Sequence, residues 1–250
     1  MYINPIFAAL PDAERQTLVR KSSRIEYKRG ELVRDYNVTT PLVYVVASGL
    51  LRVCSLTSDE KSITTGFLQR QDVYVAQGLA SDFTSESALI AALPSSVYSV
   101  PADYMRLLCA RYPQLSMELL DSTLRQSAGV RKAFRKVMSS STESIIANIL
   151  HELQRLAPSA SGGVDKRITQ ALIASYSGLS REQVNKTMRD LEARGLVKKD
   201  EHGMQVSESF GNTDFGSFDV PAPAPPPAEP PMLPDGFLDN LEPPSRRYRR

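Results

Sequence analysis

The sequence contains little cysteine and little histidine, and both shortages limit its chemistry. Only two cysteines, Cys54 and Cys109, and two histidines, His151 and His202, occur in 250 residues. Two cysteines are too few for a disulfide framework or a structural zinc site, so both are predicted to be reduced thiols in a core. The scarcity of both residue types disfavours metal sites and histidine-based catalysis. We therefore predict no metal, no cofactor and no catalytic residue, and hence no enzyme.

Long apolar runs are also missing from the sequence. No stretch of about 18 apolar residues occurs, although a membrane-spanning helix needs roughly that length. The first ten residues lack the basic segment and the apolar stretch of a secretory signal. These absences predict a cytoplasmic protein that does not contact the membrane.

Charge is distributed unevenly along the chain. The net charge is +2 overall, but before Glu208 there are 26 Lys and Arg against 21 Asp and Glu, a net of +5. Between Arg106 and Lys136, seven Lys or Arg accompany two acidic residues. A basic stretch of this kind is compatible with nucleic-acid binding and is also typical of a solvated helix face.

Residues from about Ser22 to Val100 have the pattern of many short strands. Segments rich in Val, Ile, Tyr and Leu end near Gly, Pro, Asn, Asp or Ser, which are the residues that turns require. Short strands at this spacing predict an antiparallel barrel or jelly roll. The predicted strands are 24–27, 31–34, 42–46, 50–56, 62–68, 87–93 and 96–100.

Helical patterns follow the last of these strands. Pro113 suits the first turn of a helix, where its missing amide hydrogen would have no partner, and no further proline occurs until Pro158. A long helix over about 114–138 is therefore predicted, with an apolar stripe typical of a helix that pairs with its own copy. Ser140 and Glu143 have the spacing of a capping box, and the apolar residues after them predict a second helix with one buried face.

The segment 168–197 predicts a helix-turn-helix. Thr169 and Ser180 are suited to cap two short helices, and Gly178 allows the tight turn between them. The residues that follow, 196–206, predict a small hairpin, or wing. An ordinary helical pair with a charged surface is the alternative, but the coincidence of caps, turn glycine, basic face and basic hairpin favours DNA binding.

Polar side chains on the outer face of the second helix are of the types that read base edges. Arg and Lys donate to guanine, Glu accepts from cytosine, and Asn pairs with adenine. The residues predicted to contact DNA are Thr169, Gln170, Ser180, Arg181, Glu182, Asn185, Lys186 and Arg189.

The composition changes abruptly beyond about Glu208. Ten of the 17 prolines lie in the last 40 residues, a density that disfavours helices and sheet ladders. We predict a disordered Pro-rich tail over 210–250. Its apolar and acidic part around Phe237 is a candidate docking peptide, and its arginine-rich end, 246–250, is expected to improve solubility.

The chain up to about residue 207 resembles the Crp/Fnr family of bacterial transcription regulators. The resemblance is most specific in Gly178–Val184 and Leu191–Val197, and it extends to Gly30–Leu32, Tyr44–Gly49 and Gly66–Leu68. It implies an α+β protein with a cyclic-nucleotide-binding-like antiparallel β-roll (jelly roll), a long dimerisation helix, a C-terminal winged helix-turn-helix and the tail. The implied domains are 1–112, 113–138, 139–209 and 210–250 respectively.

The resemblance also implies partners and roles for particular residues. In the family, the residues that align with Arg181, Glu182 and Lys186 contact bases. The implied partners are double-stranded DNA on a palindromic site, a second copy of the chain and RNA polymerase, with the effector unidentified. Many members of the family have Arg in place of Lys186, and Lys lacks the bidentate fork of a guanidinium.

One departure from the family concerns the effector. Members that bind a cyclic nucleotide carry a Gly-Glu pair, whose Glu meets the ribose, and an Arg that meets the phosphate. The aligned positions here are Val75–Ala76 and Glu86–Ser87. The usual cyclic-AMP cassette is therefore predicted to be absent.

Two other function classes compete with a regulator. The first is a sensor or scaffold whose β-roll or tail binds a protein, with DNA binding secondary. The second is an enzyme. His151–Glu152 begins like a zinc-protease helix, but Arg155 stands where the second histidine ligand would be, and the scarcity of His and Cys disfavours this class in general.

Overall fold

The chain is described here from a computed structural model. The described residues are 4–36, 38, 40–76, 79, 84–139, 141–207 and 210, and for 132–139 only the backbone is described. Of the predicted tail, Phe210 alone is among them. No described helix combines the length and the apolar character that crossing a membrane would require.

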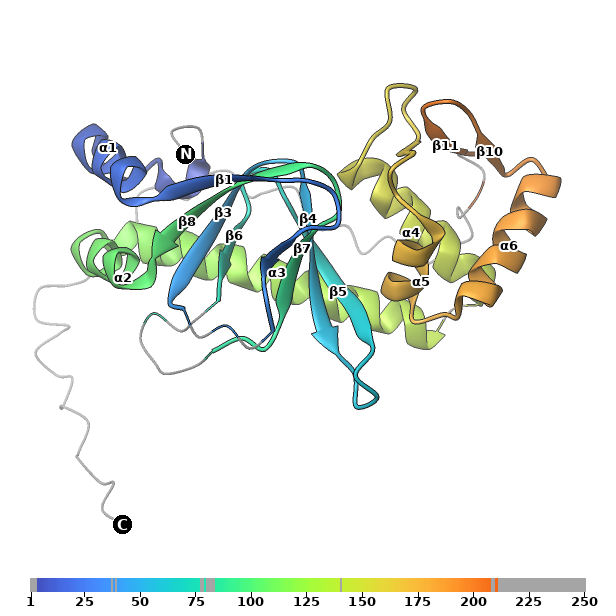
Figure 1. The fold of residues 1–250 in the computed structure, drawn as a ribbon, viewed down its shortest axis with the longest axis horizontal. Coiled ribbons are helices and arrows are strands. Elements are labelled where there is room, and N and C mark those ends of the chain that lie inside the picture. The colour runs from blue at the N-terminus through green and yellow to red at the C-terminus, as the bar shows by residue number, and fades with distance from the viewer. Residues whose placement is uncertain are drawn as a thin grey trace, which may run out of the picture. The chain divides into compact units, whose positions relative to one another are not determined.

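The N-terminal half is a roll of two antiparallel sheets. Its strands are β1 Ser23–Tyr27, β2 Leu32–Arg34, β3 Leu42–Ser48, β4 Leu50–Leu56, β5 Ser62–Gln69, β6 Val73–Val75, β7 Ala88–Ala91 and β8 Ser95–Pro101. Each sheet has four strands, in the orders β1-β8-β3-β6 and β2-β7-β4-β5 (Figure 1). The predicted antiparallel β-roll is therefore confirmed.

β3 shows how alternation of side chains builds two cores. Val43 and Val45 face outward and join an apolar cluster with the surrounding helices, whereas Tyr44 and Val46 face the space between the two sheets. Successive side chains on a strand point to opposite faces. Because all four are buried, the strand is covered on both sides.

Several elements of the roll were absent from the sequence-based prediction. These are β6, the 3₁₀ helix η1 Pro5–Phe7, and the helices α1 Asp12–Lys21 and α2 Ala102–Arg111. β6 has three residues, which is too few for a clear alternation of apolar and polar positions. In α1 only Leu18 is buried, so the helix has no apolar stripe that its sequence would reveal.

The long helix α3 runs from Pro113 to Ser139, which confirms the predicted helix over 114–138. Figure 1 shows it passing alongside the strands of the roll. Leu115 and Leu119 are buried against the roll, whereas Met117, Leu120 and Leu124 are exposed by 57%, 51% and 53%. The helix therefore packs one apolar side inside the chain and presents another to solvent.

The next helix, α4, spans Thr142–Leu156 and begins one residue later than predicted. Its N-cap is Ser141, whose side chain accepts a hydrogen bond from the amide of Ser144, so the predicted capping box of Ser140 and Glu143 is wrong. Glu143 instead forms an ion pair with Arg194, in which the guanidinium nitrogen and the carboxylate oxygen are 2.8 Å apart. Both serines are suitable N-cap residues, although only Ser140 has a glutamate three positions later.

The C-terminal domain is a winged helix-turn-helix. It consists of α4, β9 Val164–Asp165, α5 Gln170–Ser177, α6 Arg181–Ala193, β10 Val197–Lys199 and β11 Gly203–Val206. The predicted wing, β10 and β11, is confirmed. β9, which the sequence-based prediction does not include, pairs with β11 as a third strand.

Glycine allows that third strand to approach closely. A Cβ on Gly203 would lie 1.9 Å from the carbonyl oxygen of Val164, and one on Gly163 would lie 2.2 Å from that of Met204. Real Cβ atoms do not approach a backbone oxygen so closely, so both positions require glycine.

Candidate nucleic-acid interface

Helix α6 begins at a complete capping box. The side chain of Ser180 accepts a hydrogen bond from the Gln183 amide at 3.1 Å, and the Gln183 side chain accepts one from the Ser180 amide at 2.9 Å. Two amides that would otherwise lack partners are thus satisfied. The predicted cap at Ser180 is confirmed, and it determines where the helix starts.

The turn before α6 has the predicted geometry. Thr169 caps α5 by accepting a hydrogen bond from the Leu172 amide at 3.3 Å. Gly178 ends α5 in the left-handed conformation with φ of 72°, which a residue with a side chain adopts at a cost. The turn therefore brings α6 back against α5 as the sequence predicts.

Three apolar side chains fix which face of α6 is outside. Val184, Met188 and Leu191 are fully buried in one cluster with residues of α4 and α5. Their spacing of four and three positions places them on one side of a helix. The opposite side therefore carries the predicted base-reading residues.

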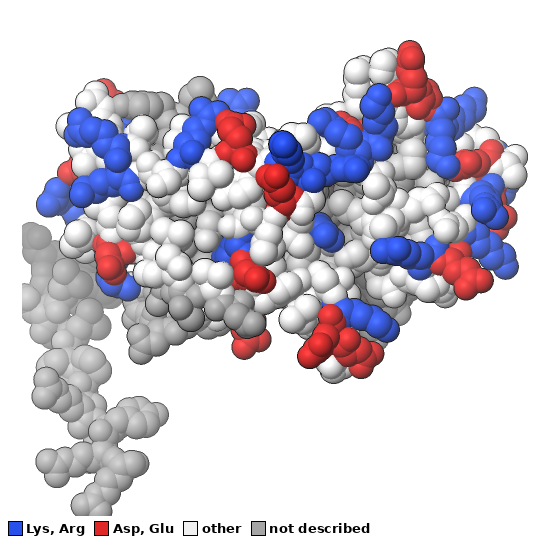
Figure 2. Space-filling view, in the orientation of Figure 1, with Lys and Arg blue, Asp and Glu red and all other residues white. Residues whose placement is uncertain are grey.

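The residues predicted to contact DNA are exposed or half-buried in this domain. Thr169 and Ser180 are exposed at the two caps, and Gln170 is half-buried at the first turn of α5. On α6 the exposed residues are Arg181, Glu182, Asn185, Lys186 and Arg189. Figure 2 shows Lys and Arg side chains, interspersed with acidic ones, over the part of the surface that carries α6 and the wing.

The cations on this face are not neutralised within the described part of the chain. Among described residues, no carboxylate lies within 4.0 Å of the charged nitrogens of Arg181, Lys186 or Arg189. Two neighbouring cations are paired, since Lys199 lies 2.5 Å from Glu192 and Arg194 pairs with Glu143. The outer face of α6 therefore carries three cations without a described carboxylate partner, beside the exposed acids Glu182 and Asp190.

A shallow hollow adjoins the start of α5. It has a volume of about 410 Å³ and is lined by Lys166, Gln170 and Lys199, among others. The Lys166 ammonium donates to the Glu201 carbonyl at 3.1 Å. The hollow presents the ammonium of Lys166 and the side-chain amide of Gln170 beside the N-terminus of α5, a combination that suits a phosphate group, whereas the ammonium of Lys199 is paired with Glu192.

The carboxylate of Asp200 accepts the hydrogen bonds that stabilise the turn of the wing. It accepts hydrogen bonds from the amides of His202 and Gly203, both at 2.7 Å, from the Ser161 hydroxyl at 2.9 Å and from the Gln205 amide group at 3.2 Å. These donors favour the ionised form, the Ser161 hydroxyl most, and lower the pKa of Asp200 to about 2. The turn between β10 and β11 is thereby tied to the loop after α4.

The first helix of the motif also contacts the β-roll. The Ser175 hydroxyl lies 3.0 Å from the Thr64 hydroxyl of β5, and the rings of Phe67 and Tyr176 meet edge to face with centroids 4.8 Å apart. The Tyr176 hydroxyl donates a hydrogen bond to the Glu152 carboxylate at 3.1 Å. The pKa of Tyr176 is raised, chiefly because the hydroxyl is buried and secondly because this carboxylate is nearby. These contacts join β5 to α5, and no pattern in the sequence reveals them.

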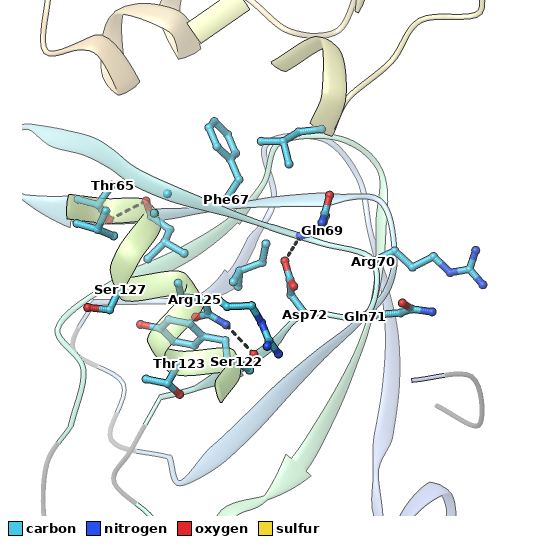
Figure 3. A pocket seen from close by; sticks show the side chains of 18 of the residues that line it. Thr65, Phe67, Gln69, Arg70, Gln71, Asp72, Ser122, Thr123, Arg125 and Ser127 are labelled. Carbon is cyan, nitrogen blue, oxygen red and sulfur yellow. Dashed lines mark hydrogen bonds between the residues drawn. The ribbon is translucent and has the colours of Figure 1, made fainter. Parts of the chain in front are cut away.

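A large cavity of about 690 Å³ lies beside the same contact. Its lining includes Phe67 and Tyr176, the hydroxyl groups of Ser87 and Thr123, and the guanidinium of Arg125. Figure 3 shows side chains from β5, from the turn after it and from α3 surrounding this space. The cavity therefore borders the roll, the long helix and the helix-turn-helix together.

The aligned cassette positions contribute little to this cavity. Of Val75, Ala76, Glu86 and Ser87, Ser87 alone is among the lining residues. Ala76 is buried and Glu86 is exposed to solvent. Neither pair of positions contains an arginine, but the guanidinium of Arg34 on β2 reaches the second pair and donates hydrogen bonds to the carbonyl oxygens of Ser85 and Ser87.

Other candidate chemistry is not assembled in the described residues. Within them, no group of three His, Cys, Asp or Glu side chains could hold a metal ion. Cys54 and Cys109 are free thiols, and burial raises the pKa of both. His151 contacts the carbonyl oxygen of Phe210.

Comparisons with known proteins match both halves of the chain. Residues 24–112 match the family model of the cyclic nucleotide-binding domain, and residues 146–208 match that of the Crp-like helix-turn-helix domain. Together the two models span more than half of the chain. Both matches end before residue 211.

A curated relative and two solved structures agree with these models. The chain is similar to the CRP-like cAMP-activated global transcriptional regulator of Mycobacterium tuberculosis, with 21% identity over 207 residues, 82% of this chain and 92% of that protein. FixK2 from Bradyrhizobium japonicum has a TM-score of 0.65 at 20% identity, covering 75% of this chain and 92% of that one. The c-di-GMP responsive regulator CLP of Xanthomonas campestris has a TM-score of 0.66 at 17% identity, covering 78% and 99%. At these identities the two structures establish likeness of fold.

Asp200 generates a prediction about pH. Because its folded-state pKa is lowered, the carboxylate stabilises the wing fully above its ordinary pKa of 3.8 and loses that effect as the pH falls towards 2. Thermal unfolding of wild type and Asp200→Asn should therefore differ by a constant amount from pH 5 to 8, and the difference should shrink below about pH 4. Ser161→Ala, which removes one donor, should move this change to higher pH. A difference independent of pH down to the acid limit would contradict the assignment.

Proposed function

The chain belongs to the Crp/Fnr family of transcription regulators, and on that basis we propose that it acts as a homodimer on a two-fold symmetric DNA site. Within this function, DNA binding by the winged helix-turn-helix follows from the family. The proposal adds the residues that contact DNA, the dimer, and independence from cyclic nucleotides. The observation that carries it is the exposed outer face of α6, whose cations have no described carboxylate partner.

The outer face of α6 supplies the base contacts in this proposal. Arg181 donates to guanine and Glu182 accepts from the cytosine amino group, while Asn185 serves adenine. Lys186 and Arg189 supply positive charge along the same groove. Lys186 contributes a point charge where an arginine would contribute two parallel hydrogen bonds, so its contact is the weaker one.

The two caps and the start of α5 supply the phosphate contacts. The hydroxyl oxygens of Thr169 and Ser180 accept hydrogen bonds within the helices, which leaves each hydroxyl hydrogen free to donate to a phosphate oxygen. Gln170 lines the hollow that holds Lys166 and Lys199. These groups position α6 in the major groove without reading sequence.

The exposed stripe of α3 supports the dimer. Met117, Leu120 and Leu124 lie three and four positions apart and are about half exposed, so an apolar strip on one helix is left uncovered by its own chain. A second copy would cover it with the same residues. Two recognition helices related by a dimer axis would then reach successive major grooves about 34 Å apart.

The effector proposal concerns the cavity between the roll and α3. With Val75–Ala76 and Glu86–Ser87 at the cassette positions, neither the ribose carboxylate nor the phosphate guanidinium is supplied there. Loss of one charge-assisted contact costs about 1.5 to 3 kcal/mol, which is about one to two decades in affinity. We expect DNA binding without cyclic AMP.

The partners and the location follow from the same proposal. RNA polymerase is proposed as a protein partner, and the cytoplasm as the location, because a transcription regulator works at the DNA. The comparisons do not favour the alternative of a scaffold in which DNA binding is secondary.

Arg181→Ala should weaken binding to an operator selected from random DNA by about 1 to 3 kcal/mol per half-site, because one bidentate base contact is lost. It should also relax the sequence preference at one position of each half-site. Fluorescence anisotropy with the operator and its single-base variants measures both effects. Lys61→Ala, an exposed cation in the turn between β4 and β5, is the control. Equal affinity of Arg181→Ala and wild type would exclude this contact.

Leu124→Arg should convert the dimer into a monomer, since it places a charge in the middle of the apolar strip on α3. Sedimentation velocity reports the change directly. Leu107→Arg is the matched control, because Leu107 is even more exposed, at 66%, and lies on α2. A dimer that survives Leu124→Arg and is disrupted by Leu107→Arg would move the interface away from α3.

Cyclic AMP and cyclic GMP should not bind the purified protein more tightly than about 1 mM, since the cassette contacts are missing. Calorimetric titration of each nucleotide into the full chain tests this, and operator affinity should be the same with and without nucleotide. A micromolar dissociation constant, together with a rise in operator affinity, would show that this cavity binds cyclic nucleotides through other residues.

A further inference from the structure

We propose that Arg34 is a built-in substitute for an effector. Its guanidinium fixes the segment that leads into β7 and, through the sheet β2-β7-β4-β5, favours the arrangement of the helix-turn-helix that binds DNA. This role rests on the proposed function, because it explains how the chain would bind an operator without a cyclic nucleotide. Arg34 is a positioning residue in this account and does not contact DNA.

The side chain of Arg34 is a buried charge. Arg34 exposes 3% of its surface, and among the described residues no carboxylate lies within 4.0 Å of its guanidinium nitrogens. A buried charge is tolerated when hydrogen bonds compensate for the lost hydration. The groups around Arg34 must therefore supply these hydrogen bonds.

Four backbone carbonyls surround the guanidinium. Nη2 donates to the carbonyl oxygens of Val38 at 2.9 Å and Ser85 at 2.7 Å. Nη1 donates to that of Asp35 at 3.2 Å and to that of Ser87. Two of these carbonyls follow β2 and the other two lead into β7. All four N–H groups of the terminal nitrogens are thus used, and the guanidinium joins the two segments.

This guanidinium lies at one of the aligned cassette positions. Ser87 belongs to the pair Glu86–Ser87, which aligns with the arginine that meets the phosphate in nucleotide-binding members of the family. Here the cation comes from β2, and only its buried Nε lacks a partner in the described part of the chain. A phosphate at Ser87 would have to displace charge-assisted hydrogen bonds that already exist. The chain itself therefore provides the contacts that hold this segment.

The same segment is tied to two further strands. The Ser85 hydroxyl lies 2.6 Å from the Tyr74 hydroxyl of β6, and the Ser85 amide donates to the Ala76 carbonyl at 2.8 Å. The Ser87 hydroxyl lies 3.3 Å from the Ser55 hydroxyl of β4. Because Tyr74 and Ser87 also line the large cavity, this part of the cavity wall is held in place without a ligand.

The sheet connects β7 to the helix-turn-helix. β4 lies between β7 and β5 (Figure 1), and Cys54 of β4 is opposite both Ala88 of β7 and Thr64 of β5. Cys54 has no exposed surface and Thr64 exposes 4%. The Thr64 hydroxyl in turn meets that of Ser175 on α5. One buried row of residues therefore separates the start of β7 from the contact with α5.

This connection has a consequence for DNA affinity. The apparent affinity of a protein for its ligand falls in proportion to the fraction of molecules in the binding-competent arrangement. Loss of the Arg34 contacts would release the start of β7 and lower that fraction. Mutations within a coupled network change affinity by roughly two- to thirty-fold, so the effect is measurable.

Two full-length variants of equal charge test the role of Arg34. Arg34→Gln and the control Arg20→Gln, at an exposed position of α1, each lower the net charge from +2 to +1. Without nucleotide, Arg34→Gln should weaken binding to the selected operator about three-fold or more, and Arg20→Gln should bind as wild type does. Arg34→Lys should fall between them, because an ammonium donates from one point. Equal or tighter binding by Arg34→Gln would overturn the inference.

A double-mutant cycle with Ser175 separates this role from a general structural one. Ser175→Ala removes the hydroxyl that meets Thr64, so the further loss caused by Arg34→Gln should be much smaller in that background. Independent, additive effects of the two substitutions would show that Arg34 does not act through this contact and would overturn the inference.

The thiol of Cys54 reports on the sheet without relying on DNA. In a Cys109→Ser background, Arg34→Gln should speed the reaction of Cys54 with an aromatic disulfide reagent, whereas Arg20→Gln should not. An unchanged rate would refute the clamping of β7. If wild type bound no selected DNA, the proposed function would fail, and this rate would still decide whether Arg34 holds β7.

A substitution away from Arg34 decides the matter if Arg34→Gln does not fold. Thr64→Val keeps the shape of the side chain and removes the hydroxyl that meets Ser175. It should weaken operator binding about three-fold or more without nucleotide. Operator affinity equal to that of wild type would overturn the inference.

Discussion

The presentation of α6 depends on the burial of three of its side chains. Val184, Met188 and Leu191 have no exposed surface, and burying side chains of this kind is worth about 1.5 to 3 kcal/mol each. Rotating the helix would expose them and would bury charged residues such as Arg181 without partners, which costs still more. The apolar core of the domain therefore determines which residues face the outside, and the capping box at Ser180 determines where they begin.

The β-roll is connected to this domain partly through contacts on β5. Elsewhere the Arg29 guanidinium donates to the Arg167 carbonyl, and Leu50, Ala92 and Leu93 belong to the same apolar cluster as residues of α4. Thr64 meets Ser175 through a hydrogen bond, and Phe67 meets Tyr176 through an aromatic contact. Phe67 and Tyr176 also line the large cavity. Two of the side chains that join the domains are thus part of the wall of the space between the roll and α3, so this aromatic contact relates the cavity to the helix-turn-helix.

Much of this architecture was predictable because it depends on local patterns. Thr169, Gly178 and Ser180 mark helix ends by chemistry that acts over three or four residues, and each functions in the structure as predicted. The three-residue strand β6 and the weakly apolar helix α1 were missed because their burial depends on distant neighbours. The N-cap is Ser141 and not the expected Ser140, since either serine can cap a helix and Glu143 forms an ion pair with Arg194. The contact of Ser175 with Thr64 joins residues 111 positions apart, and no periodicity in the sequence reveals it.

Selection of DNA from a random library by the purified full-length chain, without added nucleotide, tests the central claim most directly. The account predicts enrichment of a two-fold symmetric sequence whose half-sites are centred about one helical turn apart. The enriched sequence should be unchanged when cyclic AMP is present. Enrichment of a single asymmetric half-site, or no enrichment unless a cyclic nucleotide is added, would contradict it.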